Sequence, residues 1–152
     1  MSDGAGLPVA GASSTAVSAH GLCDLKVLEQ VYLKVVEASP DAKVVVDESG
    51  RIIVFNLQAE LMFGYDRSEV LGGLIEQLVP DALRERHGGL RQGYFREPLV
   101  REMAAGRALH GRHRNGSEFA VQIKLAPLIV AGAGVHVLAV VRRAAVAAPR
   151  TE

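Results

Sequence analysis

The 152-residue chain lacks several features that would each point to a class of function. Its only cysteine is Cys23, so an internal disulfide is excluded. Basic and acidic residues balance at 17 each, so no net charge attracts nucleic acid or an anionic membrane. No apolar run reaches the roughly 20 residues that cross a bilayer, and the N-terminus lacks the basic and apolar pattern of a secretory signal. We therefore expect a cytoplasmic protein with no direct nucleic-acid or membrane partner.

Sequence features of catalysis are missing as well. There is no glycine-rich phosphate loop, and no nucleophile, base and orienting group can be assembled from the sequence. His110 and His113 are three residues apart in a predicted strand, where they would face opposite sides of a sheet and could not share a metal ion. We expect a protein that is not an enzyme.

The N-terminal part divides in two by composition. Residues 1–22 are rich in Gly, Ala and Ser and lack the large apolar side chains that offset chain ordering, so they predict a disordered arm. Residues 23–38 predict an amphipathic helix with Asp24 as its N-cap and an apolar stripe. The stripe consists of Leu25, Leu28, Tyr32 and Val35. It must cover either its own domain or a second copy of the chain, and we favour a homodimer contact.

The remaining residues predict an α+β domain. "AKVVVD" and "RIIVFN" are β-branched runs on either side of Glu48-Ser49-Gly50, which predicts a hairpin. Short helical segments follow Asn56, and a second hairpin is predicted at Asn115-Gly116. The apolar residues from Phe119 to Leu125 alternate with polar ones, so that strand has one buried face. The stretch from 126 to 141, interrupted by Pro127, favours two short strands. We expect an antiparallel sheet of about five strands with helices on one face.

A helix predicted to open with Pro80 at its first position carries a histidine on its apolar side. Leu83, His87, Leu90 and Tyr94 follow the spacing that stacks side chains along one helix face. Two glycines after His87 each cost about 1 kcal/mol in a helix interior, so tertiary contacts must hold this helix. His87 is either a structural histidine with a hydrogen-bond partner or a ligand to something bound in a pocket.

Residues 39–143 resemble a PAS domain of the bacterial sensory type. The resemblance rests on "SPDAKVVVDESGRIIVFNLQAELMFGYDRSEVLGG" and "GRHRNGSEFAVQIKLAPL". Within them the matching positions are Asp47, Gly50, Ile52, Asn56, Phe63-Gly64-Tyr65, Glu69, Gly72 and Asn115-Gly116-Ser117-Glu118-Phe119. The resemblance implies the PAS fold, with five antiparallel strands and helices across one face, and a non-catalytic role in sensing and often in dimerisation. The tail, residues 144–152, lacks the Asp-Ile-Thr-like corner with which such domains commonly lead into a signalling helix.

Within that family the chain is most similar to the haem-containing oxygen-sensor domains of rhizobial histidine kinases. Their proximal haem histidine lies in a run similar to "RERH", which places it at His87, and their signalling arginine falls at Arg107. The resemblance implies that Ile123 and Leu125 line the cofactor. Two positions depart from the pattern: Glu102 replaces an aliphatic distal residue and Gly93 replaces a propionate-binding arginine.

The predicted cofactor-binding set is therefore His87, Arg107, Ile123, Leu125, Leu90, Tyr94 and Met103. Met103 is included because its thioether could supply a sixth iron ligand. The sequence leaves three occupants open: haem b held by His87, another small ligand, or none. With haem the chain would sense O2, CO or NO and relay its state to an output domain or partner protein. With no ligand it would be a dimerisation and protein-interaction domain.

Overall fold

The computed structural model describes residues 19–103 and 109–145, with side chains from residue 24 onward. The chain divides into two units, residues 1–35 and residues 36–152. Helix α1 runs from Ala19 to Ala38, so the prediction of a disordered arm is wrong for residues 19–22, and Asp24 lies inside the helix rather than at its cap.

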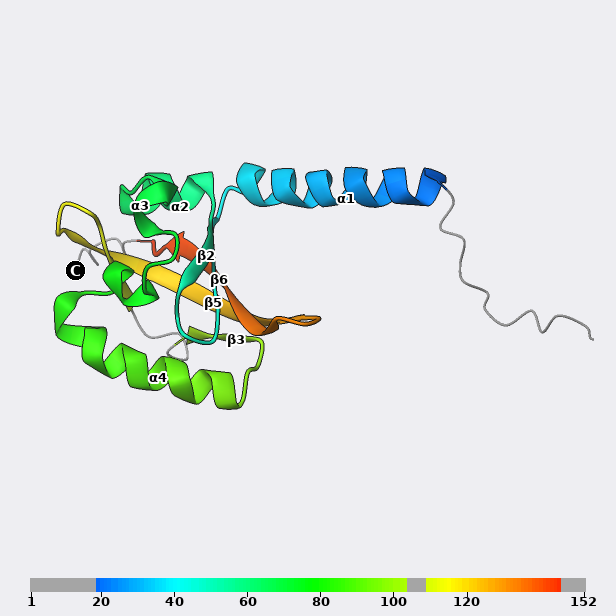
Figure 1. Ribbon diagram of the computed structural model, residues 1–152. Helices are drawn as coiled ribbons and strands as arrows, with labels where there is room; N and C mark the ends of the chain where they lie inside the picture. Colours follow the sequence, from blue (N-terminus) through cyan, green and yellow to red (C-terminus); the bar gives the residue numbers. More distant parts are fainter. Residues whose placement is uncertain (1–18, 104–108, 146–152) are drawn as a thin grey trace, which may run out of the picture. The chain divides into compact units, whose positions relative to one another are not determined.

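The second unit is built on an antiparallel sheet with strand order β2-β1-β6-β5-β3, and β4 also pairs with β5 (Figure 1). All five predicted strands are present, and a two-residue strand β3 is added. The strands are β1 Ala42–Val46, β2 Ile52–Phe55, β3 Arg101–Glu102, β4 Leu109–Arg112, β5 Glu118–Val130 and β6 Gly134–Arg143. The predicted α+β fold is confirmed.

Both predicted hairpins form, and each turn is closed by its own side chains. Asp47 Oδ1 accepts from the backbone N–H groups of Ser49 and Arg51, both at 3.0 Å. Gly50 has φ +81°, a left-handed conformation that residues with a side chain rarely adopt. At the second turn, Asn115 Oδ1 accepts from the Ser117 backbone N–H at 2.9 Å. These local bonds explain why short sequence signals were sufficient to predict the turns.

Strand β5 corrects one prediction. It continues through Pro127 to Val130 and pairs with β6 along its whole length, whereas the sequence favoured short strands broken near the proline. The pairing with β3 reaches only Leu125, so beyond that residue β5 has a neighbouring strand on one side only. Proline lacks a backbone N–H, and a strand tolerates this at such an edge.

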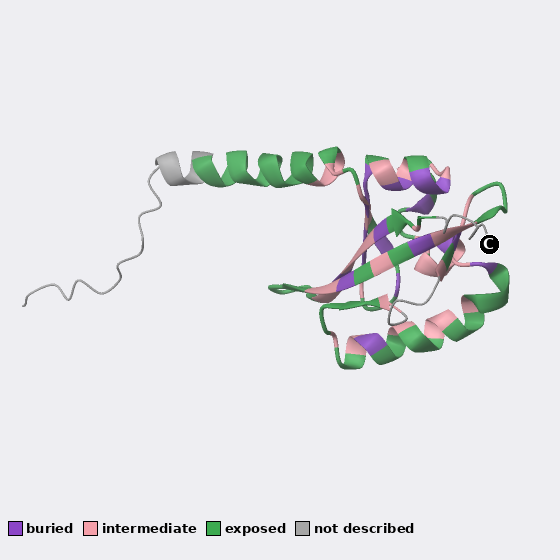
Figure 2. Ribbon diagram, turned by 180° about the vertical axis from the view of Figure 1, so that it is seen from behind, coloured by how far each residue is buried: buried purple, intermediate pink, exposed green. Residues whose placement is uncertain are grey.

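Helices cover one face of the sheet. They are α2 Leu57–Phe63, α3 Arg67–Val70, the 3₁₀ turns η1 Ile75–Leu78 and η2 Asp81–Leu83, and α4 Arg84–Arg96. Their buried side chains form one core cluster with alternate strand residues such as Val44, Val121 and Val137. Figure 2 shows the resulting alternation of buried and exposed residues along the long strand β5. Pro80 precedes η2 rather than opening α4, because a 3₁₀ turn is inserted before the helix.

Candidate functional site

The inner face of β5 is apolar, as the sequence predicted. Val121 is 1 % exposed and Leu125 is 7 % exposed, while Phe119 and Ile123 are partly buried and pack against the core. Gln122, on the opposite face, is exposed. Alternation along the strand therefore provides an apolar surface, and the helices of the same unit pack on it.

The predicted apolar stripe on α4 is only partly buried. Tyr94 is 6 % exposed and belongs to the core, but Leu83 and Leu90 are exposed. Polar side chains occupy the face that the helix turns toward the preceding segment, where His87 and Arg91 are mostly buried. The predicted apolar side is therefore not buried at Leu83 and Leu90.

Glu76 on η1 is the partner of His87. Glu76 Oε1 lies 3.3 Å from His87 Nδ1 and accepts from Arg91 Nε at 2.8 Å. Burial by itself raises the pKa of the Glu76 carboxyl, but the hydrogen bonds from Arg91 and His87 outweigh it and hold that pKa below its usual value. The sequence did not identify Glu76 as a site residue. Its partners His87 and Arg91 lie 11 and 15 positions later, and the turn that brings them together follows no local spacing rule.

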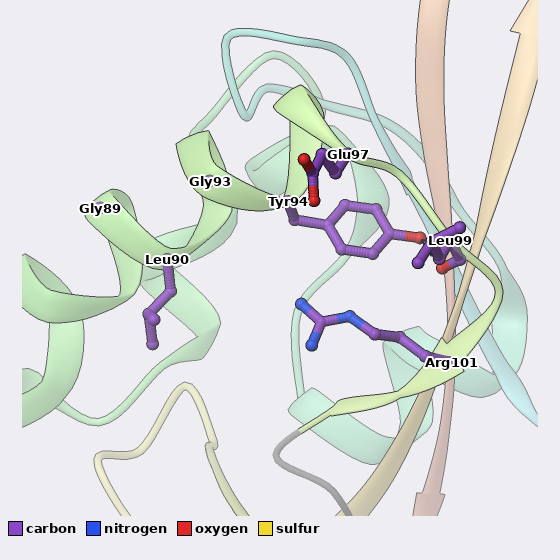
Figure 3. A pocket seen from close by; sticks show the side chains of 7 residues that line it. All are labelled: Gly89, Leu90, Gly93, Tyr94, Glu97, Leu99 and Arg101. Atoms are coloured by element: carbon purple, nitrogen blue, oxygen red, sulfur yellow. Dashed lines mark hydrogen bonds between the residues drawn. The ribbon is translucent and has the colours of Figure 1, made fainter.

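A pocket of about 370 Å³ lies beside the C-terminal half of α4. Figure 3 shows the Arg101 side chain reaching from β3 to the Tyr94 ring, with the guanidinium carbon 5.2 Å from the ring centroid. The Tyr94 hydroxyl donates to the Leu99 carbonyl at 2.5 Å, and burial raises its pKa. The lining consists of Gly89, Leu90, Gly93, Tyr94, Glu97, Leu99 and Arg101.

The structure brings together part of the predicted set. Leu90 and Tyr94 line the pocket, whereas His87 does not. Ile123, Leu125 and Met103 belong to or pack against the core cluster that contains Tyr94. Arg107 lies outside the described residues. Arg101 and Glu97 were not predicted, since the two-residue strand that positions Arg101 has no sequence signal of its own.

Two further observations concern only the described ranges 19–103 and 109–145. In this part of the chain, no group of three His, Cys, Asp or Glu side chains is placed to hold a metal ion. No helix within these ranges has the length and apolar character needed to cross a membrane.

Comparisons with known proteins agree with this architecture. A family model described as "PAS fold" matches residues 32–144. The sensor protein FixL of Bradyrhizobium diazoefficiens is 28% identical over 101 residues, which are 66% of this chain and 20% of that protein. The oxygen sensor protein DosP of Escherichia coli is 28% identical over 116 residues, which are 76% of this chain and 14% of that protein. The chain thus spans a fifth or less of these relatives.

Solved structures give the same result for the fold. The PAS domain of an HTR-like protein from Haloarcula marismortui has a TM-score of 0.65 and 26% sequence identity, covering 81% of this chain and 99% of that one. The LOV protein of Rhodobacter sphaeroides has a TM-score of 0.63 at 17% identity, covering 80% of this chain and 69% of that one. The second likeness concerns the fold alone.

Proposed function

Since this chain belongs to the PAS-fold family, we propose that it is a non-catalytic sensory module that binds a small ligand or cofactor between helix α4 and the inner face of the sheet. The observation that carries the proposal is the pocket beside Leu90 and Tyr94, next to a core that includes Leu125. Its volume of about 370 Å³ falls within the range of small-molecule sites, roughly 300 to 1,000 Å³. The bound state is relayed to an output domain or partner protein.

In its specific form, the cofactor is haem b and His87 is the iron ligand. The pocket as it stands does not fit this group, because His87 is not among the residues that line it. His87 Nδ1 faces a carboxylate, the usual second partner of a metal-bound imidazole, and His87 Nε2 makes no hydrogen bond within the described ranges. The side chains of Ile123 and Leu125 supply an apolar wall. The similarity to an oxygen sensor protein supports a role in sensing oxygen. Haem, when bound, provides iron with an open position for O2, CO or NO.

Helix α4 is suited to a change of position. A porphyrin is larger than the pocket, so α4 has to move away from the sheet to admit it. Gly88, Gly89 and Gly93 weaken the helix by about 1 kcal/mol each relative to alanine, which lowers the cost of such a movement. A ligand that favours one of two positions of α4 by about 1–3 kcal/mol changes the ratio of the two populations about 5- to 150-fold.

A second candidate, a dimerisation and protein-interaction domain with no ligand, is favoured by one observation. Leu25, Leu28, Tyr32 and Val35 on α1 are all exposed. A stripe of this kind is typical of a helix that pairs with another copy, and we propose a homodimer through α1 and the sheet.

The absorption spectrum of the protein, expressed with haem supply, tests the haem proposal. A Soret band is expected, with its loss in His87→Ala. The matched control is His110→Ala, because His110 is exposed on β4 and should leave the band unchanged.

Folded, colourless protein would refute the haem form. Mass spectrometry of a solvent extract then tests the broader sensor proposal, which predicts a bound small molecule. An empty extract, together with dimers in sedimentation, would favour the interaction domain instead.

A further inference from the structure

Two side chains of opposite charge line the pocket beside α4 without forming an ion pair with each other. The Glu97 carboxylate comes from the residue that follows the last turn of α4, and the Arg101 guanidinium comes from β3 (Figure 3). The ion pairs within the described residues join other groups and include neither of these two side chains. Both charges are therefore available to a molecule bound in the pocket.

The Arg101 guanidinium is held in place by an aromatic ring. Its central carbon lies 5.2 Å from the centroid of the Tyr94 ring, which is a cation–π contact. The ring is fixed in turn, because Tyr94 is 6 % exposed and its hydroxyl donates to the Leu99 carbonyl. A cation–π contact uses none of the N–H donors of the guanidinium, and these donors match a carboxylate in bidentate geometry. Arg101 is thus positioned to bind a carboxylate.

The surroundings of Glu97 favour the opposite charge. Glu97 follows the last residue of α4, where the unpaired carbonyls of a helix form the negative end of its dipole. A carboxylate accepts hydrogen bonds but cannot donate them, so this end of the pocket suits an ammonium group. A simple anion in the pocket would bind Arg101 but be repelled by Glu97, and a simple cation would meet the reverse. A zwitterion satisfies both charges.

The remaining lining is apolar and leaves room beside the helix backbone. A Cβ atom added at Gly89 or at Gly93 would meet no other atom within 4 Å, so the space next to both glycines is open. Leu90 and Leu99 add aliphatic surface. A water molecule takes up about 30 Å³ in the liquid, so a pocket of about 370 Å³ holds a molecule of about ten non-hydrogen atoms. This is the size of an amino acid with a branched aliphatic side chain.

We propose that the pocket binds an apolar α-amino acid. Arg101 holds its carboxylate and Glu97 holds its ammonium group. The side chain of the amino acid lies against Leu90 and the open backbone at Gly93. The assignment rests on the proposed sensory function, for which it names the class of ligand, and it does not involve haem.

The first test uses the wild-type chain and isothermal titration calorimetry. The probes are L-leucine, 4-methylpentanoate, which lacks the ammonium group, and 3-methylbutylamine, which lacks the carboxylate. We expect L-leucine to bind and each analogue to bind about tenfold more weakly, because each leaves one charged side chain of the pocket without its partner. Absence of binding by L-leucine would overturn the proposal, and so would equal affinities for all three probes.

The second test changes the pocket. Arg101→Met should weaken L-leucine binding about tenfold and abolish the preference for L-leucine over 3-methylbutylamine, and Glu97→Gln should abolish the preference over 4-methylpentanoate. The matched controls are Arg96→Met and Glu85→Gln, which remove the same charges from exposed positions of α4 outside the lining. Gly93→Leu should block binding without lowering the Tm, since leucine favours a helix more than glycine does.

Wild-type affinity in Gly93→Leu, or equal losses in the pocket variants and the controls, would overturn the proposal. The outcome for the sensory function is separate. If L-leucine does not bind but mass spectrometry of a solvent extract finds another small molecule that is missing from Gly93→Leu, the amino-acid assignment fails and the sensory function stands. If the extract is empty as well, both fail.

Discussion

Replacement of Asn56 by alanine should destabilise the domain more than any surface substitution. Asn56 is completely buried, and its side chain makes four hydrogen bonds. Oδ1 accepts from the backbone N–H groups of Lys43 at 2.8 Å and Ala59 at 3.0 Å. Nδ2 donates to the carbonyls of Val36 at 2.8 Å and Asp41 at 3.0 Å. One side chain thus joins the end of α1, strand β1 and the N-terminus of α2.

The size of the effect follows from these bonds. Loss of the N-cap bond to Ala59 costs about 1 kcal/mol. Loss of each of the other three bonds costs about 1 kcal/mol. We therefore expect Asn56→Ala to lower the free energy of unfolding by about 4 kcal/mol, and the Tm by on the order of 15 °C.

Equilibrium unfolding in urea measures this loss, with an unchanged m-value as evidence that the two end states are the same. The control is Asn115→Ala, in which the lost bonds belong to an exposed turn and the cost should stay near 1 kcal/mol. A loss below about 1.5 kcal/mol for Asn56→Ala would refute the reasoning, because it would mean that the buried backbone groups find other partners.

Two further predictions concern acid stability and one glycine. The hydrogen bonds and charge of Arg67 hold the pKa of Glu37 below its ordinary value of 4.5, so this carboxylate stabilises the fold above pH 4.5 and the contribution is lost as pH falls through the folded pKa. Arg67→Met should therefore reduce the loss of folding free energy as pH falls below 4.5, measured by acid titration followed by circular dichroism. The same pH dependence in the variant and the wild type would contradict this. Gly50→Ala should lower the free energy of unfolding more than Gly72→Ala does. Both glycines have a left-handed φ, +81° and +80°, but only at position 50 would the added Cβ also contact Arg91. Equal losses in urea unfolding would show that the Arg91 contact is unimportant.

Much of the fold could be predicted because its signals are local. The Asp47–Gly50 and Asn115–Gly116 turns are closed by side chains within the turn itself, and the alternation from Phe119 to Leu125 reports the inner face directly. The continuation of β5 through Pro127 could not be read in this way, because it depends on where the neighbouring strand β3 ends.

The candidate site was only half predictable. His87 could be identified as an unusual residue on its helix, and Tyr94 as part of a buried face. The partner Glu76 and the approach of Arg101 to Tyr94 could not, since each depends on a turn or a two-residue strand that brings separate segments together. The exposure of Leu83 and Leu90 was misjudged for the same reason: spacing describes a helix face but not what covers it.

By itself, the sequence determined five of the six strands in the described residues, the two hairpin turns and the buried face of β5, because alternation and turn chemistry act between residues a few positions apart. Only the tertiary structure decided which side chain His87 meets, how α4 begins and where a pocket opens. Those outcomes depend on distances between segments that packing sets.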